Sequence, residues 1–489
     1  MKAFRAPLYE LGEVAEIREK MGKARGVIQV TGCIDSQKAH LIDCLGEDCR
    51  HRIIVAANDL KAKELYEDYR FFDREALLYP AKDFIFFQAD IHSNLLEQQR
   101  IEVWRALAEG RPVTVILTMA AFMNHLMPFE KWKKHICRLS IGDEMELEDW
   151  KKRLLELGYE RNAQVEGPGQ YALRGGILDV FPLTEENPVR IELWGDEIDS
   201  IRSFDAESQR SIENLDYVDI YPASELILDR DVREAGLKKI LREGEKAQKV
   251  LRSAMKTEEA HRVKTLMEET RDKLEEFEDP SGLDGFLDYF YPDAVSILDC
   301  FPEDTVIFLD EPNRLAESAA AAEQEFRESM EHRLEKGYVL AGQTSLLFSC
   351  QEMIGRLCGR CCVGLCTLEN AKNPWKVDGK YNVSVRAVNP YNNSFELLVK
   401  DLQRWKKEGY RVILLSASRT RGGRLAEDLR DNGLNAFYTE EEERLVQPGE
   451  ILVTYGSSQR GYEYPLIKFV VISETDIFGR WKKKKRRRK

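Results

Sequence analysis

The spacing of hydrophobic and polar residues divides the chain into segments of different character. Over roughly the first 135 residues, short apolar runs alternate with segments whose apolar positions recur at helical spacing. The predicted strands are Gly26–Thr31, Arg52–Ala57 and Val113–Thr118, and the predicted helices between them are Asp59–Asp73 and Gln98–Glu109. This alternation is typical of an α/β domain built on a parallel sheet.

A different pattern occupies Tyr159–Pro222, where short β-like runs are separated by turns rich in glycine and proline. The runs are Gln170–Leu173, Ile177–Phe181, Val189–Trp194, Ile198–Phe204 and Tyr217–Tyr221. Compact antiparallel modules have this spacing. The segment therefore predicts a small β-rich domain that interrupts the α/β chain.

The α/β rhythm returns after this segment. Asp229–Glu278 is highly charged with leucine and valine at helical spacing, which predicts two helices, and Thr305–Leu309 predicts another buried strand. Because strands return, the first domain is expected to be discontinuous around the insertion. The expected parts are 1–135 with 227–375, the insertion at 136–226, a second small α/β domain at 385–476 and a basic linker at 477–489.

The composition, 43% hydrophobic and 33% charged over 489 residues, is that of a well-cored globular protein. No apolar run reaches the roughly 18 residues of a membrane helix, and the N-terminus has no signal-peptide core. We therefore expect a cytoplasmic protein without membrane contact. Ten cysteines in such a protein predict reduced thiols, and the cluster Cys358–Cys366 has one CxxC pair with no second pair, which predicts no metal site.

The formal net charge of −13 conceals a basic end. Residues 482–489 are all lysine or arginine, so the other 65 basic residues stand against 86 acidic ones, a balance of −21. An acidic body argues against broad contact with nucleic-acid phosphates. We interpret the basic end as a solvated linker, with DNA binding through it as the alternative.

The segment after the first predicted strand, Gly32 to Ala39, stands where a P-loop would lie. A working P-loop, G-x-x-x-x-G-K-S/T, uses its second glycine to let backbone amides wrap phosphates and its hydroxyl to hold Mg²⁺. Gly32 and Lys38 are present, but Gln37 replaces the second glycine and Ala39 replaces the hydroxyl. These replacements predict a vestigial nucleotide site.

Asp310 and Glu311 end the later predicted strand as a pair of acids, in the place of the Walker B residues that coordinate Mg²⁺. Beside a degraded P-loop they are interpreted as a relic, and a capping aspartate at a strand end is the alternative. A second functional hypothesis is an active ATPase that uses Lys38, Asp310 and Glu311. Nucleotide-stimulated phosphate release would support it.

Charged residues mark one face of the β-rich segment. Arg174 closes one run, and Arg190 and Glu192 stand two residues apart on the next, so they point to the same side of a strand. Arg161 precedes the segment and is expected to join that face. The alternative is a solvated face with ordinary cross-strand ion pairs.

The linked elements of this segment resemble the UvrA-binding domain shared by UvrB and the transcription-repair coupling factor Mfd. The elements are R-N-x-Q at Arg161–Gln164, Y-x-x-R-G-x-x-x-D-x-F-P at Tyr171–Pro182 and R-x-E at Arg190–Glu192. UvrB sequences usually carry another arginine where this chain has Ala172, and they have an intact P-loop. The chain therefore resembles Mfd over essentially its whole length, and we expect it to correspond to the N-terminal third of such a protein.

This resemblance implies a function and partners. A degenerate RecA-like domain is expected to present the inserted domain, whose Arg161, Arg174, Arg190 and Glu192 recruit UvrA for transcription-coupled nucleotide excision repair. The resemblance implies no cofactor for this chain, because ATP and Mg²⁺ belong to the family's translocase motor. RNA polymerase and double-stranded DNA are expected to bind only through domains outside this chain. In the family a C-terminal domain masks the UvrA-binding surface, so without that domain the surface is expected to be open.

Overall fold

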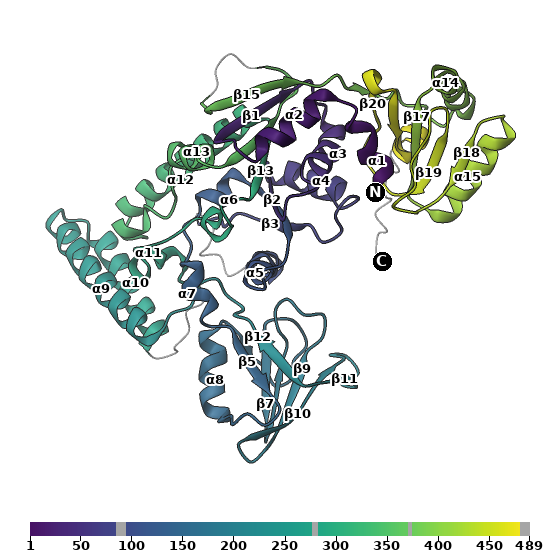
Figure 1. Cartoon of the computed structure of the whole chain (residues 1–489). Helices are drawn as coiled ribbons and strands as arrows, with labels where there is room; N and C mark the ends of the chain where they lie inside the picture. The colour runs from purple at the N-terminus through teal and green to yellow at the C-terminus, as the bar shows by residue number, and fades with distance from the viewer. Residues whose placement is uncertain (85–93, 276–281, 370–373, 480–489) are drawn as a thin grey trace, which may run out of the picture.

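The computed structural model describes residues 1–84, 94–275, 282–369 and 374–479. Most of the predicted basic linker, residues 480–489, lies outside these ranges. Within them the strands form three sheets and one separate two-stranded pair. Figure 1 shows a central parallel sheet, a β-rich unit below it and a third unit at the right. The described helices are all too short or too polar to span a bilayer.

The central sheet has seven strands in the order β15-β1-β14-β13-β2-β4-β3, and every neighbouring pair is parallel. Its strands come from the chain both before and after the β-rich unit. That unit is therefore inserted between two parts of the chain that form the central sheet. The strands are β1 (Gly26–Thr31), β2 (His51–Ala56), β3 (Leu77–Tyr79), β4 (Val113–Thr118), β13 (Val306–Asp310), β14 (Cys361–Leu365) and β15 (Val377–Asn382).

Alternate residues of these strands supply two separate hydrophobic cores. Ile53 and Val55 of β2 pack on one side of the sheet, and Ile54 and Ala56 pack on the other. The second side is covered by α1 (Lys2–Leu8), α2 (Gly12–Met21), α3 (Asp35–Leu45) and α4 (Asp59–Tyr69). The first side is covered by α5 (Asn94–Ala108), α6 (Met119–Met123), α12 (Pro312–Glu335) and α13 (Cys350–Cys358).

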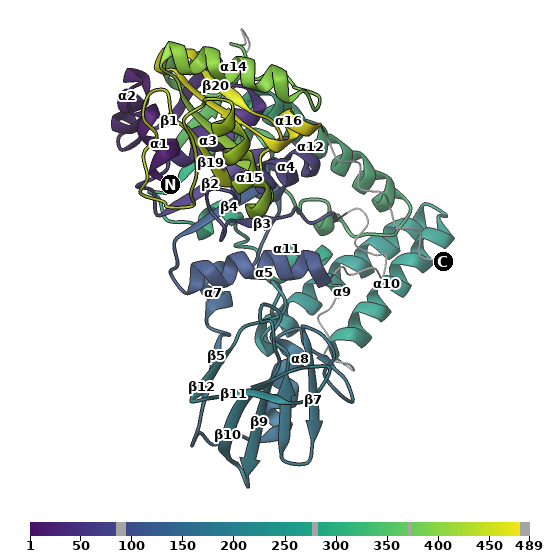
Figure 2. The same ribbon diagram turned by 90° about the vertical axis from the view of Figure 1, so that its right-hand side faces the viewer.

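Further helices extend the first core beyond the sheet. The predicted helical pair is present as α9 (Arg230–Ser253) and α10 (Thr257–Glu275), which lie side by side at the edge of the molecule (Figures 1 and 2). The short helices nearby are α7 (Phe129–Lys133), α11 (Leu287–Phe290), and the 3₁₀ turns η1 (Asp284–Phe286), η2 (Ile297–Cys300) and η3 (Ala341–Gln343).

The β-rich unit is a six-stranded sheet in the order β11-β10-β9-β8-β7-β6, antiparallel except between β6 and β7. Its apolar face packs against α8 (Leu147–Glu156) and continues the first core. The strands are β6 (Glu160–Arg161), β7 (Gln170–Arg174), β8 (Ile177–Val180), β9 (Val189–Trp194), β10 (Glu197–Phe204) and β11 (Ser211–Leu215). Separately, β5 (Cys137–Ser140) pairs with β12 (Tyr217–Ile220), where the chain enters and leaves the unit.

The third unit is a mixed sheet in the order β16-β20-β21-β17-β19-β18. Its strands are β16 (Arg386–Ala387), β17 (Arg411–Ser416), β18 (Ala436–Tyr438), β19 (Ile451–Tyr455), β20 (Tyr462–Tyr464) and β21 (Phe469–Ile472). Its helices are α14 (Phe395–Glu408), α15 (Arg419–Asp431), the 3₁₀ turn η4 (Pro465–Ile467) and α16 (Glu474–Phe478). The sequence did not predict β16 and β20, which are very short.

A buried ion-pair network fixes the exit of the β-rich unit to the central unit. The carboxylate of Glu225 accepts hydrogen bonds from Tyr79 Oη at 2.8 Å and Arg100 Nε at 2.7 Å, and Lys82 Nζ lies 2.9 Å away. Lys82 also contacts Asp284 at 2.5 Å. Burial opposes the charge on Glu225, but the charges of Arg100 and Lys82 lower the pKa of its carboxyl to about 2.

We predict that Glu225→Ala lowers the free energy of unfolding by about 3 to 5 kcal/mol, because it leaves buried cations without their counter-ion. Urea denaturation at pH 7 measures this change. The matched control is Glu185→Ala, which removes a half-exposed partner of Arg105 and is expected to cost less than about 1 kcal/mol. Equal losses in the two variants would contradict a structural role for the buried network.

Candidate functional site

The turn between β1 and α3 is filled by the protein's own groups. Gly32 has a φ of +81°, and a Cβ there would lie 2.0 Å from the carbonyl oxygen of Val383. The amide of Cys33 donates to the Cys366 carbonyl at 3.0 Å, and the amide of Ile34 donates to Gln37 Oε1 at 3.3 Å. Gln37 is completely buried. Two backbone amides that a P-loop would offer to a phosphate are therefore already hydrogen-bonded.

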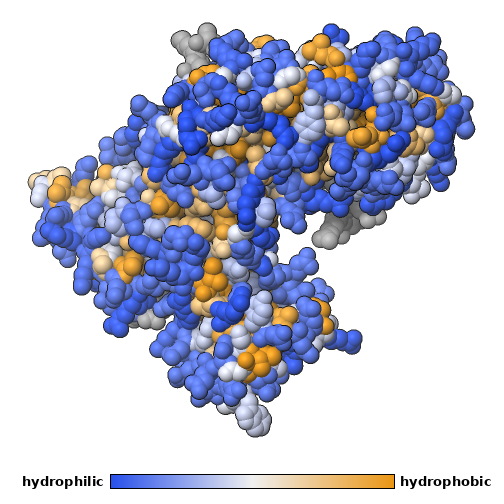
Figure 3. Space-filling view, viewed as in Figure 1, coloured by the Kyte–Doolittle hydropathy of each residue, from blue (hydrophilic) through white to orange (hydrophobic). Residues whose placement is uncertain are grey.

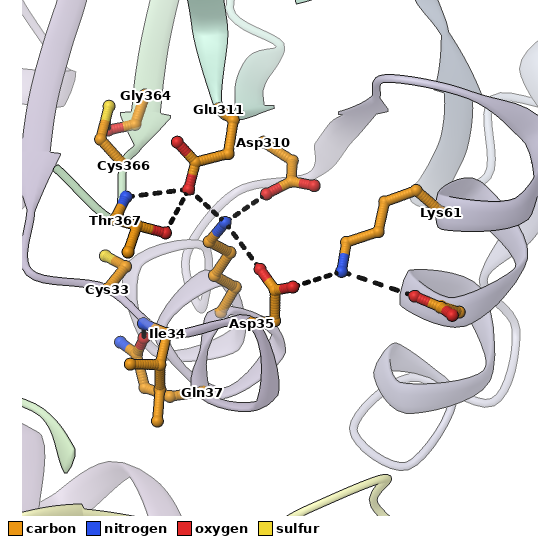
Figure 4. Close-up of polar contacts among 12 residues, drawn as sticks. Cys33, Ile34, Asp35, Gln37, Lys61, Asp310, Glu311, Gly364, Cys366 and Thr367 are labelled. Carbon is orange, nitrogen blue, oxygen red and sulfur yellow. Dashed lines mark hydrogen bonds and ion pairs between the residues drawn. The ribbon is translucent and has the colours of Figure 1, made fainter. Parts of the chain in front are cut away.

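Lys38 is completely buried. Its ammonium lies among three carboxylates, those of Asp35, Asp310 and Glu311, which are labelled in Figure 4. Its Nζ lies 2.5 Å from Asp310 Oδ1, 2.9 Å from Glu311 Oε1 and 3.2 Å from Asp35 Oδ1. Burial disfavours the ammonium, but the charges of Asp310 and Glu311 more than offset this and raise the pKa of Lys38. The Lys38 ammonium therefore stays protonated.

The acids around Lys38 have further partners. Asp35 accepts from Lys61 Nζ at 2.9 Å, and Glu311 accepts from the amide and hydroxyl of Thr367 at 2.8 and 2.6 Å. Carboxylate oxygens of Asp35, Asp310 and Glu311 lie within 4.8 Å of one another, close enough to hold a cation. The ammonium of Lys38 contacts all three, so it occupies the position that a metal ion would take.

The polar face of the β-rich sheet contains two adjacent ion-pair groups. Asp179 is buried on β8 and accepts from Arg174 Nη2 at 2.7 Å and from Arg190 Nε at 2.7 Å. Arg190 also stacks over the buried Phe204 ring, with its guanidinium carbon 4.3 Å from the ring centroid. The hydrogen bond to Asp179 raises the pKa of Arg190, and burial opposes this effect only in part. Asp179 therefore joins two of the predicted residues.

The second group joins Glu192 to β10. Glu192 forms an ion pair with Arg202 and accepts from Ser200 Oγ at 3.1 Å. Glu192 alternates with Arg190 on β9, and Ile177 of β8 lies in register between Glu192 and Arg174. Arg174, Arg190 and Glu192 are thus brought to one face of the sheet.

Arg161 does not belong to these groups. It lies on the edge strand β6 in register with Tyr171, whose side chain packs on the opposite, buried face of the sheet from Asp179. Neighbours in a parallel pair point to the same side. Arg161 itself is exposed, so it lies at the edge of the unit and on the other side from Arg190.

Trp194 extends the polar face at its open end. It alternates with Arg190 and Glu192 on β9, so the three side chains follow one another along the same face. Its side chain is 84% exposed at the hairpin between β9 and β10. Tryptophan is rarely this exposed in the absence of a partner.

Comparison with known proteins identifies this unit. Residues 137–226 match the family model described as the UvrB interaction domain. Over 468 residues the chain is 32% identical to the transcription-repair-coupling factor of Bacillus subtilis, covering 94% of the chain and 39% of that protein. Those of Staphylococcus epidermidis and Staphylococcus aureus are each 28% identical over 480 residues, covering 97% of the chain and 40% of their own length.

The chain is homologous to the N-terminal part of transcription-repair-coupling factors. It spans about two fifths of the length of these relatives. The β-rich unit, for which the sequence motifs predicted a UvrA-binding domain, is the part of the chain that matches the UvrB interaction domain.

Sequence reasoning missed three residues of the polar face in the UvrB interaction domain. Asp179 lies within the motif at Tyr171–Pro182, but no role was predicted for it from the sequence. It alternates with Ile177 on one strand, and this spacing indicates that the two side chains point to the same face. Arg202 and Trp194 also alternate with residues of that face. The strand pairing that brings them next to Arg190 and Glu192 is a tertiary feature that spacing along one strand does not contain.

The prediction that the residues around Lys38 form a vestigial nucleotide site can be tested. We predict that ATP with Mg²⁺ leaves the Tm unchanged, because Gln37 and Lys38 occupy the phosphate and cation positions. Lys38→Met should lower the free energy of unfolding by about 3 to 5 kcal/mol, since it leaves Asp310 and Glu311 without their counter-ion.

Differential scanning fluorimetry with and without nucleotide, together with urea denaturation, measures both effects. The control is Lys61→Met, whose side chain is more exposed and which pairs with the mostly exposed Asp35, so a loss near 1 kcal/mol is expected. A nucleotide-dependent rise in Tm that Lys38→Met abolishes would show that the site binds nucleotide after all.

Proposed function

We propose that this chain recruits UvrA through the polar face of its UvrB interaction domain, as the UvrA-binding part of transcription-coupled nucleotide excision repair. The observation that carries the proposal is the match of residues 137–226 to that domain, together with the ion-paired face formed there by Arg174, Arg190 and Glu192. In this proposal, contact with RNA polymerase belongs to the part of the relatives' length that this chain does not match, which is about three fifths of it.

The internal ion pairs give this face a defined geometry before any partner binds. Asp179 holds the Arg190 guanidinium over the Phe204 ring, and Arg202 forms an ion pair with Glu192. Arg174 remains 46% exposed at one end of the group. A partner therefore meets charges of fixed position, which favours specificity and rapid association over large gains in affinity.

The remaining units act as a scaffold in this proposal. The central unit is a degenerate RecA-like domain formed by residues 1–135 and by the predicted range 227–375 extended to include β15 at Val377–Asn382. It holds the inserted domain at 136–226. Because Lys38 is paired with Asp310 and Glu311, the scaffold needs neither ATP nor a metal ion. No catalytic role is assigned to the 385–476 domain.

We expect the double variant Arg174→Ala, Arg190→Ala to bind UvrA at least about tenfold more weakly than the parent chain, because the charged partners on UvrA lose their counterparts. Isothermal titration calorimetry of purified UvrA measures the difference. A matched control is Arg138→Ala, Arg230→Ala, which removes two exposed ion-paired arginines that lie outside the six-stranded sheet of the UvrB interaction domain.

The single variant Arg174→Ala separates binding from folding, because Arg174 is half-exposed while Arg190 packs on Phe204. Circular dichroism and urea midpoints should match the parent. If the parent itself shows no heat of binding with UvrA, the proposed function is wrong.

We also predict that Trp194→Ala weakens UvrA binding about tenfold or more, whereas Trp194→Phe keeps most of the affinity, because an exposed aromatic ring beside charged groups acts as an interface anchor. The control is Ile212→Ala, which removes an exposed apolar side chain from the edge strand β11. Parent-like affinity of Trp194→Ala would restrict the interface to the ion-paired residues.

A further inference from the structure

The helix α9 has a buried face that locks its orientation. Gly236, Leu237, Ile240 and Gly244 are buried against neighbouring elements. A Cβ on Gly236 would lie 2.1 Å from the Phe290 ring, and one on Gly244 would lie 2.2 Å from the sulfur of Met267. These two close approaches prevent rotation of α9 about its axis. The opposite face is therefore held toward solvent.

The outward face of α9 carries a row of cations, which we call the α9 basic stripe: Lys238, Arg242, Lys246 and Lys249. Spacings of four, four and three residues place them along one side of the helix, over roughly 16 Å. All four are exposed. Among the residues that the structure describes, none of these four side chains has an ion pair or a hydrogen bond.

The neighbouring helix α10 shows the usual alternative. There two cations pair with acids one turn away, the half-buried Arg262 with Glu258 and the exposed Lys264 with Glu268. Two exposed acidic residues lie beside the α9 basic stripe: Glu234, four residues before Lys238, and Glu245, three residues after Arg242 and four before Lys249. The four cations therefore outnumber the neighbouring acids by two. Four like charges at helical spacing repel one another and destabilise a helix by a few tenths of a kcal/mol per pair. Such a row is unexpected in a chain of net charge −13.

The position of α9 leaves the stripe accessible. The α9 and α10 pair lies at the edge of the molecule in both ribbon views (Figures 1 and 2), and in Figure 1 the third unit lies on the other side of the central sheet. In Figure 3 the surface of this region is mostly hydrophilic, with an apolar spot at its left end. A long, straight ligand could therefore lie along α9 without meeting the third unit.

We propose that the α9 basic stripe binds the phosphate backbone of double-stranded DNA without sequence preference. A straight row of four cations complements the regular charges of a duplex, where one phosphate occurs per about 1.7 Å of axis. Single-stranded nucleic acid is disfavoured because no aromatic side chain for base stacking lies among the residues of α9. An anionic membrane is disfavoured because the apolar face of α9 is buried in the protein.

This site is independent of the UvrB interaction domain and of the vestigial nucleotide site. It is also distinct from residues 482–489, whose basic side chains are the other candidate contact with DNA. The binding should be weak and electrostatic. Each lost phosphate contact should reduce the slope of log affinity against log salt concentration by about 0.9.

The test uses fluorescence anisotropy of a dye-labelled 30-base-pair duplex at several salt concentrations. The variant carries Lys238→Glu, Arg242→Glu, Lys246→Glu and Lys249→Glu. We expect this variant to bind the duplex about tenfold more weakly, or more weakly still, at low salt. The slope of log affinity against log salt concentration should become shallower by about 3 to 4. All four side chains are exposed, so its urea midpoint should stay close to that of the parent.

The matched control has the same net charge but alters exposed cations elsewhere: Lys63→Glu, Lys400→Glu, Lys407→Glu and Arg424→Glu. It should keep the parent's affinity and slope, as should a chain lacking residues 482–489. The proposal is overturned if the parent does not bind the duplex, if the control weakens binding equally, or if binding disappears only with residues 482–489. Preference for anionic vesicles over the duplex would overturn it as well.

Discussion

The ammonium of Lys38 is the charge around which the central unit is built. A buried cation is tolerated only when carboxylates surround it, and here they come from the start of α3 and from the end of β13, 272 residues further along the chain. Glu311 in turn holds Thr367, which follows β14. One ion-pair group therefore joins the carboxyl ends of β1, β13 and β14, three adjacent strands of the sheet. The parts of the chain before and after the insertion depend on it to meet in register.

The third unit reinforces the same region from outside. His40 of α3 lies between aromatic rings of both units, stacked on Tyr462 at 5.3 Å and near Phe4 and Phe72. Burial lowers the pKa of His40 to about 4, so its ring is neutral at pH 7. The second core runs continuously from α1–α4 into β17, β19, β20 and β21. The helix that would start a phosphate site is thus packed on both sides.

The sequence predicted those features that repeat along one stretch of chain. The apolar runs at Gly26–Thr31 and Val113–Thr118 are strands, and the helical spacing of 229–278 corresponds to α9 and α10. The strand β11 escaped prediction because its residues, SIENL, are mostly exposed and polar. The run Tyr217–Tyr221 is a strand, but it pairs with β5 instead of the β-rich sheet. Alternation along one strand predicted that Arg190 and Glu192 share a face. Which residues pair with them, and on which side of the sheet Arg161 lies, depends on how the strands pair. The partners Asp179 and Arg202 were therefore not predicted. Likewise, the residues of the P-loop region indicated a lost function, but not that Lys38 would neutralise both acids.

The pairing of β5 with β12 brings the two ends of the inserted domain side by side. A segment whose ends already meet adds almost no loop-closure entropy when it interrupts a host fold, and it leaves the host's own strands free to join. The β-rich unit therefore has the geometry of a transplantable cassette. Evolution could place such a cassette in a working nucleotide-dependent enzyme or in a scaffold that has lost its nucleotide site, because the recognition surface does not rely on the host's chemistry.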